Sequence, residues 1–153
     1  MTDPLLPPSV DLPARLLRQT SLLLNHASAR ANRIVSQHFD GPGGRMHYAI
    51  LAGLSEFGAV GQAEMCDRLG IDRGDAVAAL TALQASGYVQ RTPDPGDRRR
   101  NIVDITHAGE ERLGDLDSMV DAAQDELVAP LSTEERQQLN RLLRRLIERP
   151  GVT

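Results

Sequence analysis

Aromatic residues, cysteine and lysine are scarce or absent in this sequence. Aromatic residues make up 3% of the 153 residues and tryptophan is missing, so a core has to be built from Leu, Val, Ile and Ala, a composition that favours helices. The single cysteine, Cys66, cannot form an internal disulfide bond. No run approaches the roughly 20 apolar residues that a membrane-spanning helix needs. The sequence therefore predicts a mainly helical protein that does not cross a membrane.

The N-terminal segment, residues 1–13, lacks the pattern of a secretion signal. It contains four prolines, which oppose helix formation, and no basic region followed by an apolar stretch. Together with the lone cysteine, this predicts a cytoplasmic protein.

The net charge opposes a simple prediction of nucleic-acid binding. All 17 basic residues are arginine, against 21 acidic residues, and the formal net charge is −4. The absence of lysine fits a bias in codon usage. DNA affinity comes largely from neutralisation of phosphates by cations, so a DNA-binding function has to rest on where the arginines lie. Residues 45–106 carry 7 arginines and 8 acids, so positive charge is concentrated only locally. We therefore expect tight binding at specific sites and weak binding to random DNA.

Apolar residues at three- and four-residue steps predict a series of helices. No proline or glycine interrupts the first, so it is expected to be continuous. In the fourth, an apolar stripe formed by Ala76, Val77, Leu80 and Leu83 is expected to face the core. The helices are predicted over residues 14–39, 46–56, 62–69, 72–84, 107–128 and 133–149.

Capping residues and breakers mark the ends of these helices. Asp72 can accept from the amides of the next turn, and Asp75 can reach back, as in a capping box. Thr106, and Ser132 or Thr133, are the expected caps of the last two helices, whereas Gly61 stands where a serine or threonine cap would be expected. The predicted stops are Gly41-Pro42-Gly43-Gly44, Gly58, Gly70, Gly87 and Pro130.

Two short alternating runs, Tyr88–Thr92 and Asn101–Ile105, predict a β-hairpin. The segment between them contains Arg98, Arg99 and Arg100. Three neighbouring like charges repel one another, and a phosphate or minor-groove partner would relieve that repulsion. The hairpin directly follows helices 62–69 and 72–84, whose tight connection is typical of a helix–turn–helix. Helix pairs of this kind are common, so the arginine-tipped hairpin is what makes a DNA-binding unit the favoured interpretation.

Several short motifs run through this region. They are Gln62-Ala63-Glu64-Met65, Leu69-Gly70-Ile71-Asp72-Arg73, Leu83…Gly87-Tyr88-Val89…Arg91, Asp94-Pro95…Asp97-Arg98-Arg99 and Ile105-Thr106…Gly109. With them the sequence resembles the MarR family of regulators from about Arg15 to Arg149. The resemblance implies one domain over 1–153, mainly α with a small β-hairpin wing. It implies a winged helix–turn–helix at 45–106, dimerisation helices at 14–40 and 107–149, and often a small phenolic or aromatic effector that releases DNA.

The resemblance also implies that Asp97 buttresses Arg99, which enters the minor groove. A carboxylate beside a mobile arginine fixes its orientation and lowers the entropy lost on binding; the alternative is a solvated charged turn. The candidate DNA-contacting residues are Arg68, Arg73, Gly74, Asp75, Ala78, Arg91, Asp97, Arg98, Arg99 and Arg100.

The predicted recognition helix departs from the family pattern, which more often has Ser, Thr or Arg on the outward face. Two interpretations stay open. Ala78 or Ala82 could touch thymine methyls while Asp75 accepts from cytosine, or Asp75 only starts the helix and readout relies on the wing and DNA shape. The residues expected to point outward are Gly74, Asp75, Ala78 and Ala82.

An effector site is predicted where the second helix begins. Arg45, His47 and Tyr48 would supply a cation and hydrogen-bond donors to an acidic aromatic effector, and Asn25 and His26 of the first helix could line the other wall. The alternative is ordinary surface polarity at a helix start.

Other chemistry finds little support in the sequence. Cys66 lies on an apolar helix side and is interpreted as a small core residue, since redox sensing needs exposure and a low thiol pKa. His107 and Glu110 lack the companions of a metal site, unless His26, His38 or His47 converge on them across a dimer. No catalytic motif is recognisable, so no enzyme activity, metal or cofactor is predicted.

The favoured hypothesis is a homodimeric regulator, most simply a repressor, that binds double-stranded DNA with a pseudo-palindromic sequence and is released by an effector. The alternative is a dimeric small-molecule sensor or protein-interaction module with weak or lost DNA binding, which the net charge and the acidic recognition face would suit.

Overall fold

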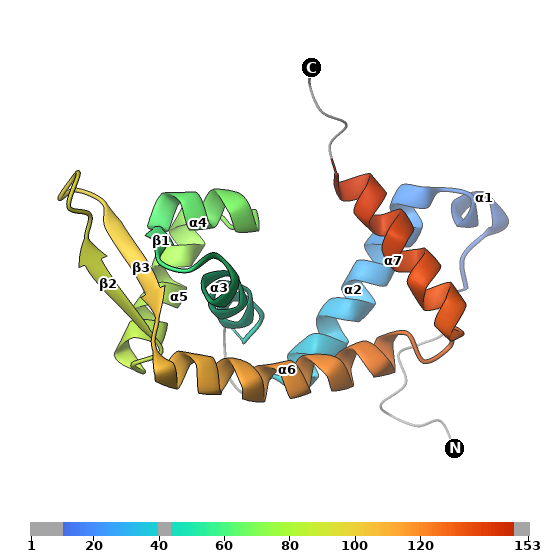
Figure 1. The fold of residues 1–153 in the computed structure, drawn as a ribbon. Coiled ribbons are helices and arrows are strands. Elements are labelled where there is room, and N and C mark those ends of the chain that lie inside the picture. Colours follow the sequence, from blue (N-terminus) through green and yellow to red (C-terminus); the bar gives the residue numbers. More distant parts are fainter. Residues whose placement is uncertain (1–10, 40–43, 149–153) are drawn as a thin grey trace. The chain divides into compact units, whose positions relative to one another are not determined.

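The computed structural model describes residues 11–39 and 44–148. It is mainly helical with one small antiparallel sheet, as the sequence predicts (Figure 1). Contacts divide the chain into two units, Met1–Arg33 and Ile34–Thr153. The elements are α1 (Ala14–Leu17), α2 (Thr20–His38), α3 (Gly44–Phe57), β1 (Val60–Gly61), α4 (Gln62–Leu69), α5 (Arg73–Ala85), β2 (Val89–Pro93), β3 (Asn101–Ile105), α6 (His107–Leu127) and α7 (Thr133–Ile147).

Some predicted features lie outside the described residues. These are the first prolines of the N-terminal segment, breaker residues 41–43 and Arg149. Gly44, expected in the breaker, is the first residue of α3. Within the described ranges, no helix combines the length and apolar character needed to cross a membrane.

The continuous helix predicted over 14–39 is wrong, because α1 and α2 are separate. The N–H of Gln19 donates to the carbonyl of Leu16 at 3.0 Å, a tighter turn than that of an α-helix. Thr20 and Ser21 follow the break, and such side chains compete for backbone hydrogen bonds and favour helix starts over interiors. Apolar spacing alone does not register a break this short.

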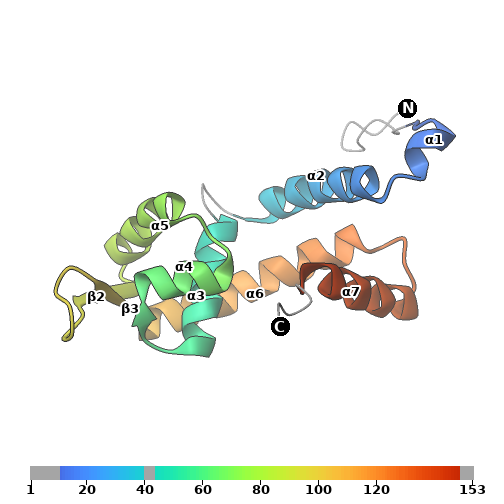
Figure 2. The same ribbon diagram turned by 90° about the horizontal axis from the view of Figure 1, so that it is seen from above.

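The core of the second unit is built around α3, which packs against α4, α5, α6 and β3 (Figure 2). Its apolar residues Ile50, Leu51 and Leu54 are completely buried. Burying an aliphatic side chain of this size contributes about 1.5–3 kcal/mol, so α3 is the main support of the second unit. The largest fully buried side chains are Ile50, Leu51, Leu54, Met65, Leu80, Leu83, Val103 and Cys66.

The sheet has the strand order β1-β3-β2, with both pairs antiparallel. The predicted hairpin is confirmed, with Val89 opposite Ile105. The short strand β1 was not predicted, since two residues carry no alternating pattern. Val60 of β1 pairs with Val103 of β3, so the sheet joins the start of α4 to the wing.

Helix caps follow the sequence closely, with one exception. The Asp72 carboxylate accepts from the amides of Gly74 at 2.8 Å and Asp75 at 3.3 Å. The reciprocal bond from Asp75 is not formed in this part of the described chain, because an aspartate is one methylene shorter than the glutamate that usually closes a capping box. At α7, Ser132 and Glu135 form the complete box.

The inward stripe of α5 differs from the prediction at one residue. Ala76, Leu80 and Leu83 are buried as expected, but Val77 is 49% exposed and Ala79 is buried instead. Each residue advances about 100° around a helix, so Val77 and Ala79 flank the stripe on opposite sides. Alanine on the inner flank lets α5 approach the core closely and turns Val77 outward.

Candidate nucleic-acid interface

The helix–turn–helix consists of α4, a three-residue turn and α5. Gly70 has a left-handed conformation with φ 65°, and its N–H donates to the Cys66 carbonyl. The N–H of Ile71 donates to the same oxygen at 3.0 Å. Because only glycine adopts a positive φ without strain, Gly70 allows the sharp change of direction before Asp72 caps α5.

The exposed face of α5 is small and mostly apolar. Gly74, Asp75 and Ala78, three of the predicted contact residues, are exposed there. Following the helix face from Gly74 at steps of three and four residues would have added further residues to the predicted DNA-contacting set. The exposed residues of α5 that were missed include Val77, Thr81 and Gln84.

The wing holds Arg99 against Asp97. The Asp97 carboxylate accepts from the backbone N–H of Arg99 at 3.1 Å, from its Nε at 3.1 Å and from its Nη2 at 3.3 Å. These hydrogen bonds lower the pKa of Asp97, first through the side chain and then through the backbone of Arg99, with a further contribution from the charge of Arg100. The Arg99 side chain is nevertheless 90% exposed, so it is oriented and still available to a partner.

The tip of the wing is a compact turn closed by backbone hydrogen bonds. Asp94 accepts from the amide of Gly96 at 2.8 Å, and the N–H of Asp94 donates to the carbonyl of Arg100 at 2.9 Å. The N–H of Arg100 donates to Asp97 at 2.8 Å. The turn therefore fixes the backbone on which the three arginines stand.

Two predicted arginines of the helix–turn–helix already have acidic partners. Nη2 of Arg73 lies 3.1 and 3.0 Å from the carboxylate oxygens of Asp67. Arg68 lies 3.7 Å from Glu64 and stacks over the ring of Phe57 at 3.5 Å. Exposed ion pairs are worth about 1 kcal/mol or less, so either arginine can exchange its carboxylate for a phosphate.

Arg91 joins the wing to α5. Its Nε donates to Oε1 of Gln84 at 2.6 Å, and its Nη2 lies 3.5 Å from Oγ1 of Thr81. The hydrogen bonds of Arg91 therefore link β2 to α5.

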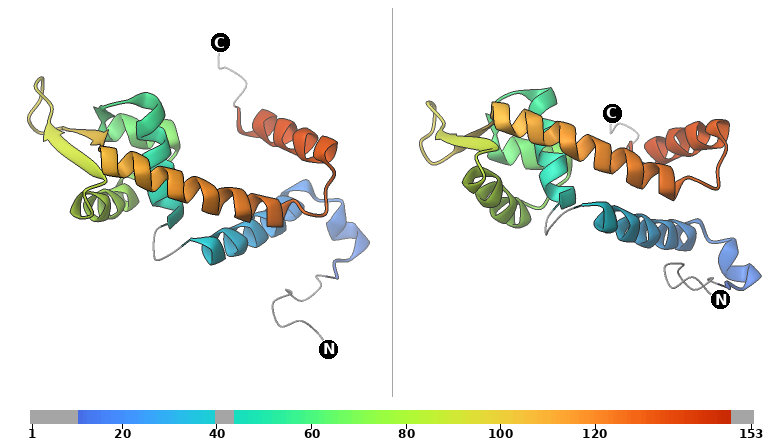
Figure 3. Two further views of the ribbon diagram at one scale, coloured as in Figure 1. Left: turned by 60° about the horizontal axis from the view of Figure 1, so that its bottom comes forward. Right: turned by 90° about the horizontal axis from the view of Figure 1, so that it is seen from below.

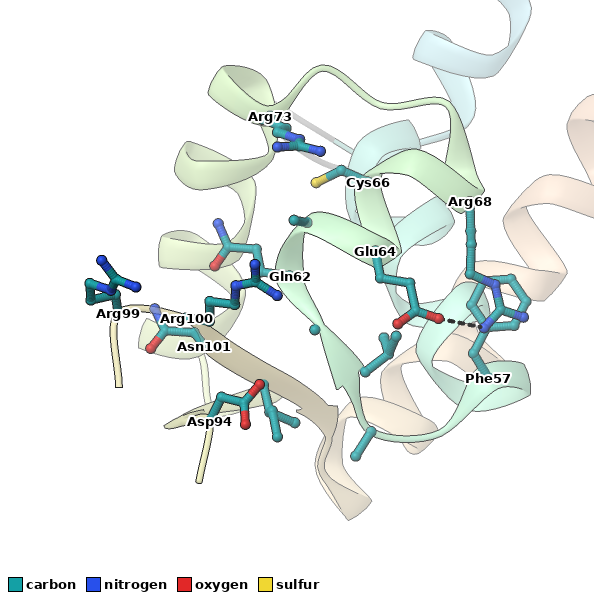
Figure 4. A pocket seen from close by; sticks show the side chains of 15 residues that line it. Phe57, Gln62, Glu64, Cys66, Arg68, Arg73, Asp94, Arg99, Arg100 and Asn101 are labelled. Carbon is teal, nitrogen blue, oxygen red and sulfur yellow. Dashed lines mark ion pairs between the residues drawn. The ribbon is translucent and has the colours of Figure 1, made fainter. Parts of the chain in front are cut away.

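A groove of about 720 Å³ separates α4 from the wing. Figure 4 shows Arg99 and Arg100 on its wing side and Arg73 and Arg68 on its helical side. Four arginines from distant parts of the sequence, Arg68, Arg73, Arg99 and Arg100, thus border one hollow. Its charge suits a strand of nucleic-acid backbone passing between the two elements.

Thr106 and Gly109 fix the return of the wing to α6. The Thr106 hydroxyl donates to the carbonyl of Gly87 at 2.6 Å and accepts from the N–H of Gly109 at 3.1 Å. The N–H of Thr106 donates to Tyr88 at 3.0 Å. A Cβ on Gly109 would overlap the backbone oxygen of Tyr88, so the Thr-x-x-Gly motif requires glycine at its last position.

His47 and Tyr48, two of the predicted effector residues of α3, lie close to α6. The Tyr48 hydroxyl donates to Asp117 at 3.0 Å. Burial, and then this hydrogen bond, raise the pKa of Tyr48. Burial, and then the charge of Arg112, lower the pKa of His47. Arg45 is exposed. Asn25 and His26 belong to the N-terminal unit, so their part in an effector site stays a prediction.

Arg112 was not among the predicted effector residues. It lines a hollow of about 460 Å³ together with His38 and Met119. Nδ1 of His38 lies 2.9 Å from the carbonyl oxygen of Ile34, and Nε2 lies 3.5 Å from Glu126. The position of Arg112 one turn into α6 could have indicated that an additional cation lies near His47.

Comparison with known proteins supports a regulator. Residues 44–100 match the MarR family pattern. Over 151 residues the chain is 31% identical to the transcriptional repressor NicR of Pseudomonas putida, covering 96% of this chain and 94% of NicR. The chain belongs to the MarR family.

Solved structures show the same fold. A probable transcriptional regulator of Pseudomonas aeruginosa superposes with a TM-score of 0.76 at 28% identity, covering 86% of this chain and 99% of that one. BpsR of Bordetella bronchiseptica gives a TM-score of 0.75 at 21% identity, covering 84% and 98%. This MarR protein is therefore a transcriptional regulator with a winged helix–turn–helix.

Three residues that the sequence analysis considered for redox or metal chemistry are Cys66, His107 and Glu110. Cys66 is 1% exposed, and burial raises the pKa of its thiol, with Arg73 opposing and Asp67 adding to the shift. His107 lies 3.6 Å from Glu111, whereas Glu110 accepts from Ser55 at 2.9 Å. Among the residues with a described placement, no three His, Cys, Asp or Glu side chains come together in a way that could hold a metal.

Proposed function

We propose that this MarR protein is a homodimeric repressor that binds a pseudo-palindromic duplex and is released by a small aromatic acid. The observation that carries the proposal is the held yet exposed Arg99 on the wing, with α5 exposed beside it. In this arrangement α5 enters the major groove and Arg99 the neighbouring minor groove. Arg98 and Arg100 add phosphate contacts.

Dimerisation is supported by an uncovered apolar stripe on α7, the C-terminal helix drawn in red in Figure 3. None of the residues of this helix is buried within the chain. Unpaired apolar stripes of this kind mark protein interfaces, and a second copy of the chain is the partner that a twofold operator requires. The stripe consists of Leu139, Leu142, Leu146 and Ile147, which are 38%, 44%, 66% and 78% exposed.

Release by an aromatic acid is supported by Arg112, the cation that acts on His47, and by Arg45 at the start of α3. Arg45 and Arg112 would attract a carboxylate, and Tyr48 could exchange Asp117 for a ligand hydroxyl. The DNA binding of BpsR is regulated by 6-hydroxynicotinic acid, a ligand of this chemistry. An effector lowers DNA affinity only if it binds the conformation that does not bind DNA more tightly. A ligand bound between α3 and α6 would do so by displacing the helix–turn–helix.

Selection of bound duplexes from random DNA tests the repressor directly. We expect enrichment of a palindromic motif with half-sites one helical turn apart, and an affinity that falls steeply with salt. The same operator then reports release by 6-hydroxynicotinic acid. Arg45→Ala and His47→Ala should reduce release, with His107→Ala, an exposed histidine, as the control. Failure to enrich any motif would contradict the proposal.

A sensor or interaction module with weak DNA binding is the second candidate. Its support is the ion pairing of Arg68 with Glu64 and of Arg73 with Asp67, together with the net charge of −4. This candidate predicts that the aromatic acid binds, measured by calorimetry, although no duplex is enriched.

A further inference from the structure

Val77 is the one large apolar side chain left exposed on α5. It is 49% exposed, although the helix buries Ala76, Leu80 and Leu83 on its other side. A valine side chain that is exposed to water loses the stabilisation that burial would give. Its side chain has no hydrogen-bonding group, so any base that it meets is recognised by apolar contact.

The polar groups next to Val77 are already engaged within the protein. The Thr81 hydroxyl donates to the backbone carbonyl of Val77 at 2.8 Å and lies 3.5 Å from Nη2 of Arg91. Oε1 of Gln84 accepts from Nε of Arg91 at 2.6 Å. The hydroxyl proton of Thr81 is therefore used within the helix. Thr81 lies one helical turn after Val77 and is exposed like it, which places its methyl group on the same side of α5.

An apolar surface on α5 would distinguish thymine from the other bases. In the major groove, the thymine 5-methyl is the apolar group that the base edges present. Cytosine and the purines present polar atoms there, which would lose water against a valine without gaining a hydrogen bond.

We infer that Val77, supported by the methyl of Thr81, reads the 5-methyl group of a thymine in each half-site. The inference rests on the proposed entry of α5 into the major groove. It makes Val77 a specificity-determining residue, while Arg99 and the other arginines supply affinity that depends little on sequence.

Two parallel selections test this contact, one from random DNA that contains thymine and one from the same pool with deoxyuridine in its place. Deoxyuridine pairs like thymine and lacks the methyl. We expect a thymine preference in each half-site that disappears from the deoxyuridine pool. On the selected operator, replacing that thymine should weaken binding about fourfold per half-site and about 15-fold for both.

Variants assign the effect to the residue. Val77→Ala should abolish the difference between thymine and deoxyuridine, and Thr81→Ser, which keeps the hydroxyl, should reduce it. Ala85→Val, on the last turn of α5, is the matched control and should leave the difference unchanged. Thermal unfolding checks that each variant folds.

The outcomes separate the inference from the function on which it rests. If neither pool enriches a motif, the proposed repressor function fails. If both pools enrich the same motif with equal affinity, or if Val77→Ala keeps the full thymine preference, the repressor stands and the role of Val77 is overturned.

Discussion

Asp97 holds Arg99 through both its backbone and its side chain, and the two residues differ greatly in exposure. The side chain of Asp97 is 30% exposed and that of Arg99 is 90% exposed. The carboxylate is thus part of the turn, whereas the guanidinium projects from it. The pair places an acid next to a DNA-contacting cation, so its role can be tested by the sign of a mutational effect.

Asp97→Ala is expected to weaken operator binding, by about threefold, because Arg99 would have to be ordered on binding. Electrostatics alone predicts the opposite, since the variant removes a negative charge close to phosphates. Arg99→Ala should weaken binding more, about tenfold, and reduce the salt slope by about one. Asp104→Ala removes the same charge from β3 and serves as the control. Tighter binding by Asp97→Ala in titrations at fixed salt would refute the buttress.

The lowered pKa of Asp97 gives a second test on the same pair. A carboxyl with a lowered folded-state pKa stabilises its contact above the ordinary Asp pKa and loses it as pH falls through the lowered value. The Arg99 contact should therefore persist at neutral pH and break only in acid. Carbon NMR of the Asp97 carboxyl should show its pKa rise in Arg99→Ala, because the first cause of the shift is then removed. An unchanged titration would contradict the assignment.

Gly109 and Gly114 lie in the same helix and should respond oppositely to alanine. A Cβ on Gly109 would meet the Tyr88 carbonyl and Ile105, whereas Gly114 has no such neighbour within 4 Å. Gly109→Ala should destabilise the protein by about 1–3 kcal/mol through overpacking. Gly114→Ala should stabilise it by about 0.5–1 kcal/mol through helix propensity. Urea unfolding measures both, and equal effects would show that the wing does not constrain Gly109.

His47 should make folding sensitive to mild acid. Burial and Arg112 lower its pKa in the folded state, so the unfolded chain binds the proton more readily. Stability should then fall as pH drops below about 6.5, the ordinary value for histidine. Urea midpoints at neutral and mildly acidic pH should move closer together in His47→Gln. If that variant keeps the full dependence, another group is responsible.

Features specified by local hydrogen bonding could be predicted from the sequence, and features specified by packing could not. Asp72, Thr106 and Ser132 mark helix starts because their short polar side chains reach nearby amides. The wing follows from alternation on both sides of a turn-forming segment. Val77 was misplaced because two rotations of α5 suit its apolar pattern, and only the close approach of Ala79 to the core selects one.

The same limit explains what was missed in the site. Strand β1 has two residues and exists because β3 offers a free edge to Val60, a relationship between distant segments that no local pattern contains. Arg112 approaches His47 only once α6 packs on α3. Asp97 and Arg99, two residues apart, needed no such packing, and their pairing was predicted from the family resemblance.

The apolar stripe on α7 should be required for assembly and, through it, for DNA binding. Leu142→Glu would place a charge in the proposed interface, where its desolvation is unfavourable, and should give a monomer in analytical ultracentrifugation. A monomer contacts one half-site, so operator affinity should fall by at least about 100-fold, as expected when linked binding is lost. Gln137→Glu adds the same charge on the other side of α7 and should remain dimeric. A Leu142→Glu protein that stays dimeric would place the interface elsewhere.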